Sequence, residues 1–376
     1  MPKIIATCAF GIESLVADEL RKLGYEDLSV DRGRVALEAG MEAICRANIW
    51  LRCADRVQVC LGEFPASTFD ELFDQTVELP WADWMPEDAE FPVMGKSVKS
   101  QLSSVPACQA VTKKAIVTAM SRRYGRERFE ETGPRYRVQV ALLKDTVTLT
   151  MDASGEGLHK RGYRDLNAPA PLRETLAAAM IALSHWQPEY ILADPCCGSG
   201  TIPIEAAMIG RNIAPGTQRS FDAFKWPCIP RKLWSAAVEE ADDLARPDRP
   251  LRIWGSDIAQ GAIALSQRHA ERAGVADGIE FTHRPLQEFK TGHKYGYLLC
   301  NPPYGERLGD VKQAEALYRD IGELHRRLKQ WSCFVLTPHE RFQGLFGSHA
   351  THRRKLYNGR IQCWLYQYFG PKPPGR

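Results

Sequence analysis

The segment YLLCNPPYGERLGD, at residues 297–310, carries the most chemical information in this sequence. An apolar run that reads as a buried strand leads directly into Asn301, Pro302, Pro303 and Tyr304. The prolines fix φ and remove backbone donors, and they bias the residues before them toward extended conformations. The pattern therefore predicts a stiff loop at the carboxyl end of a strand, which is where open α/β sheets bind their ligands.

This loop suits the methylation of a planar nitrogen. An exocyclic amine or an amide nitrogen is a poor nucleophile because its lone pair is delocalised. The side-chain oxygen of Asn301 and the carbonyl of Pro302 can accept its two N–H bonds, which aims the lone pair at an incoming methyl group. The ring of Tyr304 can stack on a flat substrate. Pro303 completes the predicted catalytic set, although an NPPY sequence by itself also fits a rigid turn without chemistry.

A second motif, ILADPCCGSGTIPIEAA at residues 191–207, predicts a cofactor site. A buried strand ends at its aspartate, a glycine turn follows, and a helix with free N–H groups begins near its threonine. The turn matches neither the GxGxxG dinucleotide fingerprint nor the GxxxxGK[ST] phosphate loop. It suits the amino-acid part of S-adenosylmethionine (AdoMet), although an ordinary βα turn fits as well. The predicted contacts are Asp194, Pro195, Cys196, Gly198, Ser199, Gly200 and Thr201.

The ends of the next two strands extend this prediction. Asp257 closes the run IWGSD (253–257), where doubly wound folds place a carboxylate against the ribose, and Ile258 follows it. The run IEFTHRPLQEF (279–289) has no aspartate where many methyltransferases bind the adenine amine. Gln287 or a backbone group can take that place. No metal site is predicted.

Short apolar runs alternate with longer helical segments through the C-terminal half, which predicts a mostly parallel sheet with right-handed crossovers. Its last segment, RRKLYNGRIQCWLYQYF (353–369), reads as two strands around Asn358-Gly359, a preferred pair for a two-residue hairpin turn. A parallel sheet closed by an antiparallel hairpin is typical of class I AdoMet methyltransferases. The stretch 209–250 is an insertion whose aromatic residues fit either a simple core, which is favoured, or a roof over the pocket. These residues are Phe221, Phe224 and Trp226.

The first sixty or so residues alternate strand-like and helix-like runs in the order β-α-β-α-β, which suits a small ferredoxin-like domain. Acidic and basic residues are separated in the next part of the sequence. Residues 60–95 have nine acidic side chains and no Lys or Arg, whereas residues 96–137 have ten Lys and Arg against three Glu. This asymmetry indicates a polyanion-binding face, with a solvated surface as the alternative. The predicted contacts, three of them in the Gly- and Pro-punctuated segment 154–171, are Lys96, Lys99, Lys113, Lys114, Arg122, Arg123, Lys160, Arg161 and Arg164.

The length of 376 residues suggests about two or three domains, and the formal net charge of +3 is uninformative as a total. No apolar stretch reaches the roughly 18 residues of a membrane-spanning helix, and the N-terminus lacks the features of a signal peptide. The eleven cysteines are scattered, without a pair of CxxC motifs. We therefore expect reduced thiols and a cytoplasmic protein.

Several runs, taken in order, resemble the THUMP-domain guanine-N2 RNA methyltransferases, in particular a short stand-alone form of the RlmL-like branch. They are HKRGYR (159–164), APLRETLAAAM (170–180), DPCCGSGTIPIEAA (194–207), RNIAPG (211–216) and NPPYGERLG (301–309). The resemblance implies an α/β fold class, with α+β ferredoxin-like and THUMP domains before a Rossmann-like class I methyltransferase domain. The implied boundaries are a ferredoxin-like domain at 1–64, a THUMP domain that binds RNA at 65–155, a linker at 156–170 and a methyltransferase domain at 171–376.

By the same resemblance, residues 194–201 line the AdoMet pocket, Asp257 binds its ribose, and residues 301–304 hold guanine N2. The function predicted is AdoMet-dependent formation of N2-methylguanosine in large-subunit rRNA, on a base that is unpaired or flipped out. THUMP enzymes of similar length also modify tRNA, so tRNA is the first alternative. Methylation of a protein glutamine or of adenine N6 also fits the NPPY loop, and an RNA-binding assembly factor with a vestigial methyltransferase domain is the non-enzymatic alternative.

Overall fold

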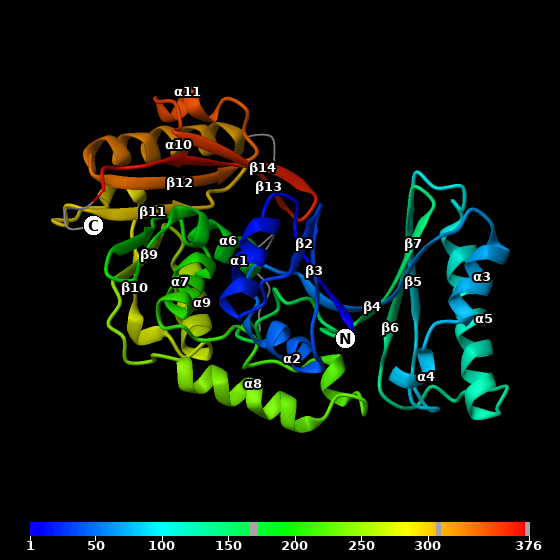
Figure 1. Ribbon diagram of the computed structural model, residues 1–376. Helices are drawn as coiled ribbons and strands as arrows, with labels where there is room; N and C mark the ends of the chain where they lie inside the picture. The colour runs from blue at the N-terminus through cyan, green and yellow to red at the C-terminus, as the bar shows by residue number, and fades with distance from the viewer. Residues whose placement is uncertain (165–171, 306–309, 373–376) are drawn as a thin grey trace. The chain divides into compact units, whose positions relative to one another are not determined.

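The computed structural model describes residues 1–164, 172–305 and 310–372 (Figure 1). The chain divides into two compact units, and each of them is assembled from separate stretches of sequence. The first unit comprises Met1–Cys8, Val16–Leu158 and Arg219–Ala241. The second comprises Ala9–Leu15, His159–Gln218 and Asp242–Arg376.

One seven-stranded sheet organises the first unit, in the order β2-β3-β1-β4-β7-β6-β5. The strands are β1 (Lys3–Thr7), β2 (Leu28–Asp31), β3 (Arg34–Glu38), β4 (Arg56–Pro65), β5 (Val93–Val98), β6 (Arg137–Leu143) and β7 (Thr146–Asp152). The long strand β4 pairs antiparallel with β1 on one side and with β7 on the other. The regions predicted as ferredoxin-like and THUMP modules therefore share a single sheet. The predicted hairpin turn at Lys144 and Asp145 is present, and both residues have the positive φ that such a turn requires.

The helices of this part of the chain lie between these strands and in the segment after residue 219. They are α1 (Glu13–Lys22), α2 (Met41–Trp50), α3 (Phe69–Val77), α4 (Trp81–Trp84), α5 (Val105–Tyr124), the 3-10 helix η1 (Asp222–Lys225) and α8 (Arg231–Leu244). Helix α3 begins with a capping box between Thr68 and Glu71. Helix α5 has Pro106 in its first turn and ends at Gly125, whose φ is 67°.

The aromatic residues of the insertion form core contacts within the first unit. Trp226 stacks on Tyr136 with ring centres 4.5 Å apart, and its indole nitrogen donates to the Arg135 carbonyl at 2.9 Å. Phe221 stacks on Trp234 at 5.4 Å. The prediction of a core is confirmed for Phe221 and Trp226, whereas it is wrong for Phe224, which is 43% exposed. The alternative of a roof over the pocket is wrong for all three, because none of them lines the pocket described below.

The second unit contains the predicted sheet, in the order β10-β9-β8-β11-β12-β14-β13. Five strands are parallel, and β14 and β13 close the sheet as an antiparallel hairpin. Their bounds are β8 (Ile191–Asp194), β9 (Ile253–Asp257), β10 (Ile279–His283), β11 (Gly296–Cys300), β12 (Trp331–Thr337), β13 (His352–Asn358) and β14 (Ile361–Tyr368). The turn of this hairpin differs by one residue from the prediction. Its loop is Gly359-Arg360, with Gly359 at φ 63°, so Asn358 is the last residue of a strand.

Helices cover both faces of this sheet, with α10 and α11 on one side and α6, α7 and α9 on the other (Figure 1). Their bounds are α6 (Glu174–Ser184), α7 (Thr201–Gly210), α9 (Gln260–Arg272), the 3-10 helices η2 (Ala276–Gly278) and η3 (Leu286–Glu288), α10 (Asp310–Arg327) and α11 (Phe342–Phe346). All seven residues of β12 are buried, as expected for a central strand between two helical layers. No helix in the described part of the chain combines the length and apolar character needed to cross a membrane.

Candidate active site

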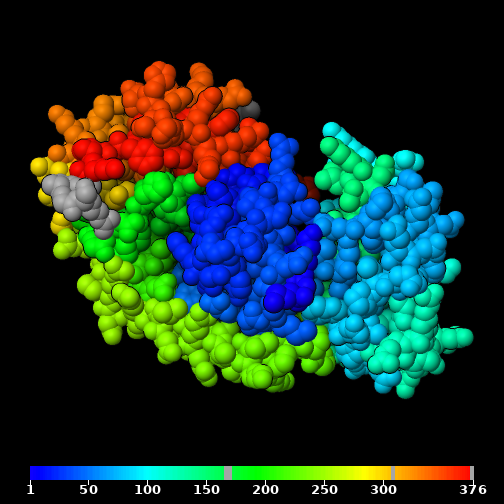
Figure 2. Space-filling model, in the orientation of Figure 1, coloured from blue at the N-terminus to red at the C-terminus, as the bar shows by residue number. Residues whose placement is uncertain are grey.

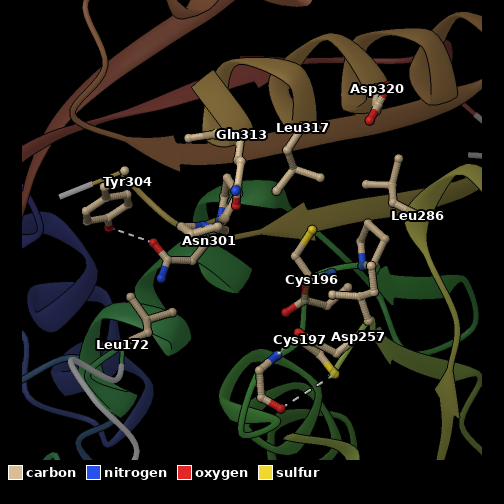
Figure 3. Close-up of a pocket in the computed structure, with 18 of the residues that line it drawn as sticks. Leu172, Cys196, Cys197, Asp257, Leu286, Asn301, Tyr304, Gln313, Leu317 and Asp320 are labelled. Carbon is tan, nitrogen blue, oxygen red and sulfur yellow. Dashed lines mark hydrogen bonds between the residues drawn. The ribbon is translucent and has the colours of Figure 1, made fainter. Parts of the chain in front are cut away.

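A pocket of about 860 Å³ lies at the carboxyl ends of β8, β9 and β11 in the second unit (Figure 3). It brings together both predicted motifs, whose first residues are more than 100 positions apart in the sequence. Of the predicted site residues, those that line it are Asp194, Pro195, Cys196, Gly198, Ser199, Thr201, Asp257, Ile258, Gln287, Asn301, Pro302, Pro303 and Tyr304. Gly200 is not among the lining residues. It precedes α7 at φ 82°, and a Cβ there would lie 2.7 Å from the Ser266 side chain, so it allows close helix packing.

Asp257 holds the glycine turn in place. One of its carboxylate oxygens accepts the Gly198 N–H at 2.9 Å, and the other accepts the Ala259 N–H at 2.9 Å, at the start of α9. Each carboxylate oxygen keeps a further lone pair, so the side chain can still accept hydrogen bonds from a ligand. Ile258 beside it is 74% exposed, an apolar side chain that faces a cavity without protein cover.

The electrostatics of the pocket fit a cationic ligand. Asp194 is only 2% exposed, and burial together with nearby Asp257 raises its pKa well above the usual carboxyl value. Asp310 and Asp320 also line the pocket, whereas no Lys, Arg or His is among its described lining residues. A ligand with an ammonium and a sulfonium group would relieve this repulsion, so the residues present fit AdoMet.

The NPPY loop forms a hydrogen-bonded cluster on the other side of the pocket. The Tyr304 hydroxyl donates to the Asn301 side-chain oxygen at 2.6 Å (Figure 3) and accepts from the Asn358 amide at 3.3 Å. Burial raises the pKa of Tyr304, so its hydroxyl keeps the proton that it donates. The Tyr318 hydroxyl donates to the Pro303 carbonyl at 3.2 Å and fixes the loop from the side of α10. The acceptor predicted for a substrate amine is thus already polarised by a tyrosine.

The motif-based prediction missed two groups of lining residues. Helix α10 contributes Asp310, Gln313, Leu317 and Asp320, and the hairpin contributes Asn358 and Ile361. The spacing of the α10 residues, three or four positions apart, is that of one helix face and could have identified them. Asn358 was hidden because its pairing with glycine pointed to a turn. The run at 279–289 lacks the aspartate that many methyltransferases place against the adenine amine. Asp320 of α10 is a partial counterpart, since it lines the same pocket and accepts a hydrogen bond from the Gln287 amide at 2.6 Å.

The predicted RNA contacts differ in their surroundings. Lys96, Lys99, Lys114, Arg122, Arg123 and Lys160 are exposed. Lys113 is half-buried and donates to the Glu131 carboxylate at 2.6 Å. Arg161 is 2% exposed and paired with buried Glu205, so its prediction as an RNA contact is wrong. Arg164 also points inward, to the Glu174 carboxylate at 3.2 Å and to the Thr201 hydroxyl.

Comparison with known families identifies each region of the chain. A family model described as the RMKL-like methyltransferase domain matches residues 161–367. Models described as the RlmL ferredoxin-like domain and the THUMP domain match residues 3–58 and 66–152. These matches follow the predicted order, whereas the predicted boundaries at 64, 155 and 170 stay predictions.

Individual proteins resemble nearly the whole chain. It is 47% identical over 99% of its length to "Putative RNA methyltransferase YpsC" of Bacillus subtilis, covering 97% of that protein. It is also 33% identical to "Ribosomal RNA large subunit methyltransferase K/L" of Legionella pneumophila, and it spans 52% of the length of that protein.

Solved structures share the fold over the same extent. One, described as a predicted N6-adenine-specific DNA methylase from Listeria monocytogenes, is 49% identical with a TM-score of 0.94, covering 98% of this chain and 96% of that one. Another, described as "SMU.472, a putative methyltransferase complexed with SAH", is 43% identical with a TM-score of 0.93, covering 99% of both chains.

Proposed function

This chain belongs to the RMKL-like methyltransferase family, and on that premise we propose that it transfers a methyl group from AdoMet to the N2 amine of a guanine in RNA. We propose large-subunit ribosomal RNA as the target. One observation carries the proposal: the Asn301-Pro302-Pro303-Tyr304 loop and the acid-lined cofactor half belong to one pocket. A substrate amine held by this loop would therefore lie beside the methyl donor.

The acids and the glycine turn support the proposal that one half of the pocket binds the cofactor. Asp194 would take the ammonium group, and Asp257 would accept the ribose hydroxyls while it holds Gly198. Ile258 and Leu286, which both line the pocket, would supply apolar contacts for a flat base. When bound, AdoMet supplies an electrophilic methyl group on its sulfonium.

The substrate half positions the amine without a general base. The Asn301 oxygen and the Pro302 carbonyl accept its two N–H bonds, which leaves the nitrogen lone pair directed at the methyl group. Both acceptors also favour the tetrahedral, cationic nitrogen of the transition state. Asn cannot remove a proton, and none needs to leave before the attack, because the nitrogen becomes acidic only once it is methylated.

RNA as the substrate is supported by the THUMP match and by the relatives named as RNA and rRNA methyltransferases. Exposed cations of the first unit, Lys96, Lys99, Lys114 and Arg123, are available to phosphates. The target base would have to be unpaired or flipped to reach the pocket. The similarity to the Listeria protein, which is described as a predicted N6-adenine-specific DNA methylase, favours adenine N6 as the second candidate, since that amine can make the same hydrogen bonds to the loop.

Nucleoside mass spectrometry tests the proposal. Large-subunit rRNA, small-subunit rRNA and tRNA are purified separately from a strain that lacks this gene and from its parent, and are then digested to nucleosides. We expect N2-methylguanosine to fall in large-subunit rRNA and to return with the wild-type gene but not with Asn301→Ala. A loss of N6-methyladenosine would overturn the choice of base, and a loss confined to tRNA would overturn the choice of RNA. Unchanged nucleosides in all three fractions would contradict the proposed function.

A further inference from the structure

We propose that the β13–β14 hairpin, together with Phe10, forms a second RNA-binding surface that holds the strand next to the target base. This inference rests on the proposed function and adds to it, since the predicted RNA contacts all lie between residues 96 and 164. This hairpin surface comprises Phe10, Arg353, Lys355, Tyr357 and Arg360. All five belong to the second unit, which also contains the pocket.

The charge of the hairpin is entirely positive. Residues 352–369 contain four Lys and Arg and no Asp or Glu. Arg353, Lys355 and Arg360 are exposed, and none of them forms an ion pair with a described acidic residue. Other exposed arginines of the chain are paired, such as Arg122 with Glu78. Unpaired cations on one short element match the phosphate backbone of a single strand.

Aromatic rings lie among these cations. Phe10 is 53% exposed and meets Tyr357 edge to face, with ring centres 6.1 Å apart. The Lys355 ammonium lies 5.7 Å from the centre of the Tyr357 ring, and the Arg353 guanidinium lies 4.7 Å from that of Trp364. Surfaces that combine exposed rings with cations bind single strands by stacking and by charge together.

The backbone conformation of the next residue, Gly11, fixes the position of Phe10. Gly11, the next residue, has a φ of 94°, and a Cβ on it would lie 2.7 Å from the Lys355 carbonyl oxygen. Only glycine allows the segment to approach β13 this closely. Phe10 is therefore fixed against the hairpin, and its exposed ring is a defined feature of the surface.

The turn of the hairpin links the hairpin surface to the substrate half of the pocket. Asn358 and Ile361 flank the hairpin turn and also line the pocket, and Asn358 donates to the Tyr304 hydroxyl. A nucleotide in the pocket would thus have a neighbour beside Arg360 in the turn. Lys355 and Tyr357 lie on the other face of β13 from Asn358, because side chains alternate along a strand, so the RNA strand would reach them by passing around the turn. In Figure 2 the C-terminal strands, drawn in red, contribute to the molecular surface.

A different explanation for the cations is protection of an exposed edge. β13 is the last strand of its sheet, and Lys or Arg on such strands prevents pairing with other chains. An exposed phenylalanine beside the same strand would weaken that protection. The two explanations also differ in what they predict for RNA binding.

The test measures binding of the full chain to a fluorescently labelled single-stranded RNA of mixed sequence at several salt concentrations. For Lys355→Gln with Arg360→Gln, we expect weaker binding and a salt slope (log affinity against log salt) reduced in magnitude by about 1.4, from about 0.7 per phosphate contact on a single strand. The matched control, Lys290→Gln with Lys329→Gln, removes the same charge from exposed positions outside the hairpin and should keep the wild-type slope.

Phe10→Ala provides the second arm. It should weaken RNA binding about 5-fold or more at an unchanged salt slope, and Phe10→Trp should restore it. S-adenosylhomocysteine affinity should be unchanged in every variant, which shows that the second unit is folded. A wild-type chain without salt-dependent RNA binding would contradict the proposed function itself. If the wild type binds RNA and the hairpin variants match the control, only the hairpin surface is overturned, and aggregation of those variants would then support edge protection.

Discussion

The amide oxygen of Asn301 has two partners to satisfy, the Tyr304 hydroxyl and the proposed substrate amine. A carbonyl oxygen can accept both hydrogen bonds, so the tyrosine fixes the amide rotamer and leaves one lone pair for the substrate. Asn301→Ala should lower turnover about 100-fold or more because it removes an acceptor that acts in the transition state. The dissociation constant of S-adenosylhomocysteine should stay within about twofold, as measured by calorimetry.

Tyr304→Phe is the matched comparison for Asn301→Ala. It keeps the aromatic ring and removes the hydroxyl that bonds both Asn301 and Asn358. The bond to Asn301 is the one that acts on the substrate acceptor and is worth about 1 kcal/mol, so we expect a loss of about fivefold in turnover. Full activity of Asn301→Ala would show that this loop is only a rigid turn. A larger loss in Tyr304→Phe than in Asn301→Ala would transfer the main role to the hydroxyl.

Asp194 should make ligand binding in the pocket depend on pH. Burial and Asp257 raise its pKa, so the carboxyl is protonated over a wider range of acidic pH than usual. Affinity for S-adenosylhomocysteine should therefore increase as pH rises from the ordinary carboxyl pKa through the raised one, when the carboxylate that attracts the ammonium group forms. Asp194→Asn should bind weakly and without this pH dependence. A pH profile that the variant shares with the wild type would refute the assignment.

The same shift in pKa predicts an effect on stability. A carboxyl whose pKa is raised by folding favours the folded state while it is protonated, and this contribution is lost as pH rises from the ordinary carboxyl pKa through the raised one. At neutral pH the ligand-free Asp194→Asn variant should consequently melt at a higher temperature than the wild type. The wild type should recover the difference when it binds its ligand.

At the scale of elements, residues 161–164 hold two helices beside the pocket. Arg161 pairs with Glu205 of α7, and Arg164 contacts Glu174 of α6 and Thr201 at the start of α7. Removing one partner of a buried pair leaves an uncompensated charge, so Arg161→Met should lower the free energy of unfolding by about 3–5 kcal/mol. Arg161→Met with Glu205→Leu should recover much of that loss in urea denaturation.

RNA binding provides the control for this prediction. Because Arg161 is buried, its substitution should leave the salt slope of RNA binding unchanged at temperatures where the variant is folded. The sequence alone could not distinguish this arginine from exposed Lys160, since both stand in one basic run. Their difference arises from Glu205, which lies 44 positions away and faces the run only in the folded chain.

The β13–β14 hairpin shows which features of an element the sequence predicts and which it does not. Alternation of apolar residues and the Asn358-Gly359 pair predict two strands and a turn, and the structure confirms the hairpin. The loop is shifted by one residue because glycine takes the positive φ and Asn358 completes the strand. That shift gives the Asn358 side chain its contact with Tyr304, which depends on packing between distant segments and has no local signal.

At the scale of the whole molecule, the order of the three predicted regions agrees with the family matches. The sequence did not indicate that the first two share one sheet, because β4 has an ordinary apolar pattern and its two partners lie on opposite sides of it in the chain. Nor did it indicate that residues 219–241 belong to the first unit. Long-range packing, rather than local propensity, decides which strands share a sheet and which unit a distant segment joins.

Helix α5 allows the RNA-binding role of the first unit to be tested with an internal control. Lys114 and Arg123 are exposed and form no ion pair with a described residue, whereas Lys113 and Arg122 pair with Glu131 and Glu78. Lys114→Gln with Arg123→Gln should reduce the salt slope of RNA binding by about 1.4 to 1.8 in magnitude. Lys113→Gln with Arg122→Gln should change it less, because their charges are already partly neutralised. Equal slopes for the two double variants would show that ion pairing on this helix does not decide which cations meet RNA, and an unchanged slope in both would exclude α5 from the interface.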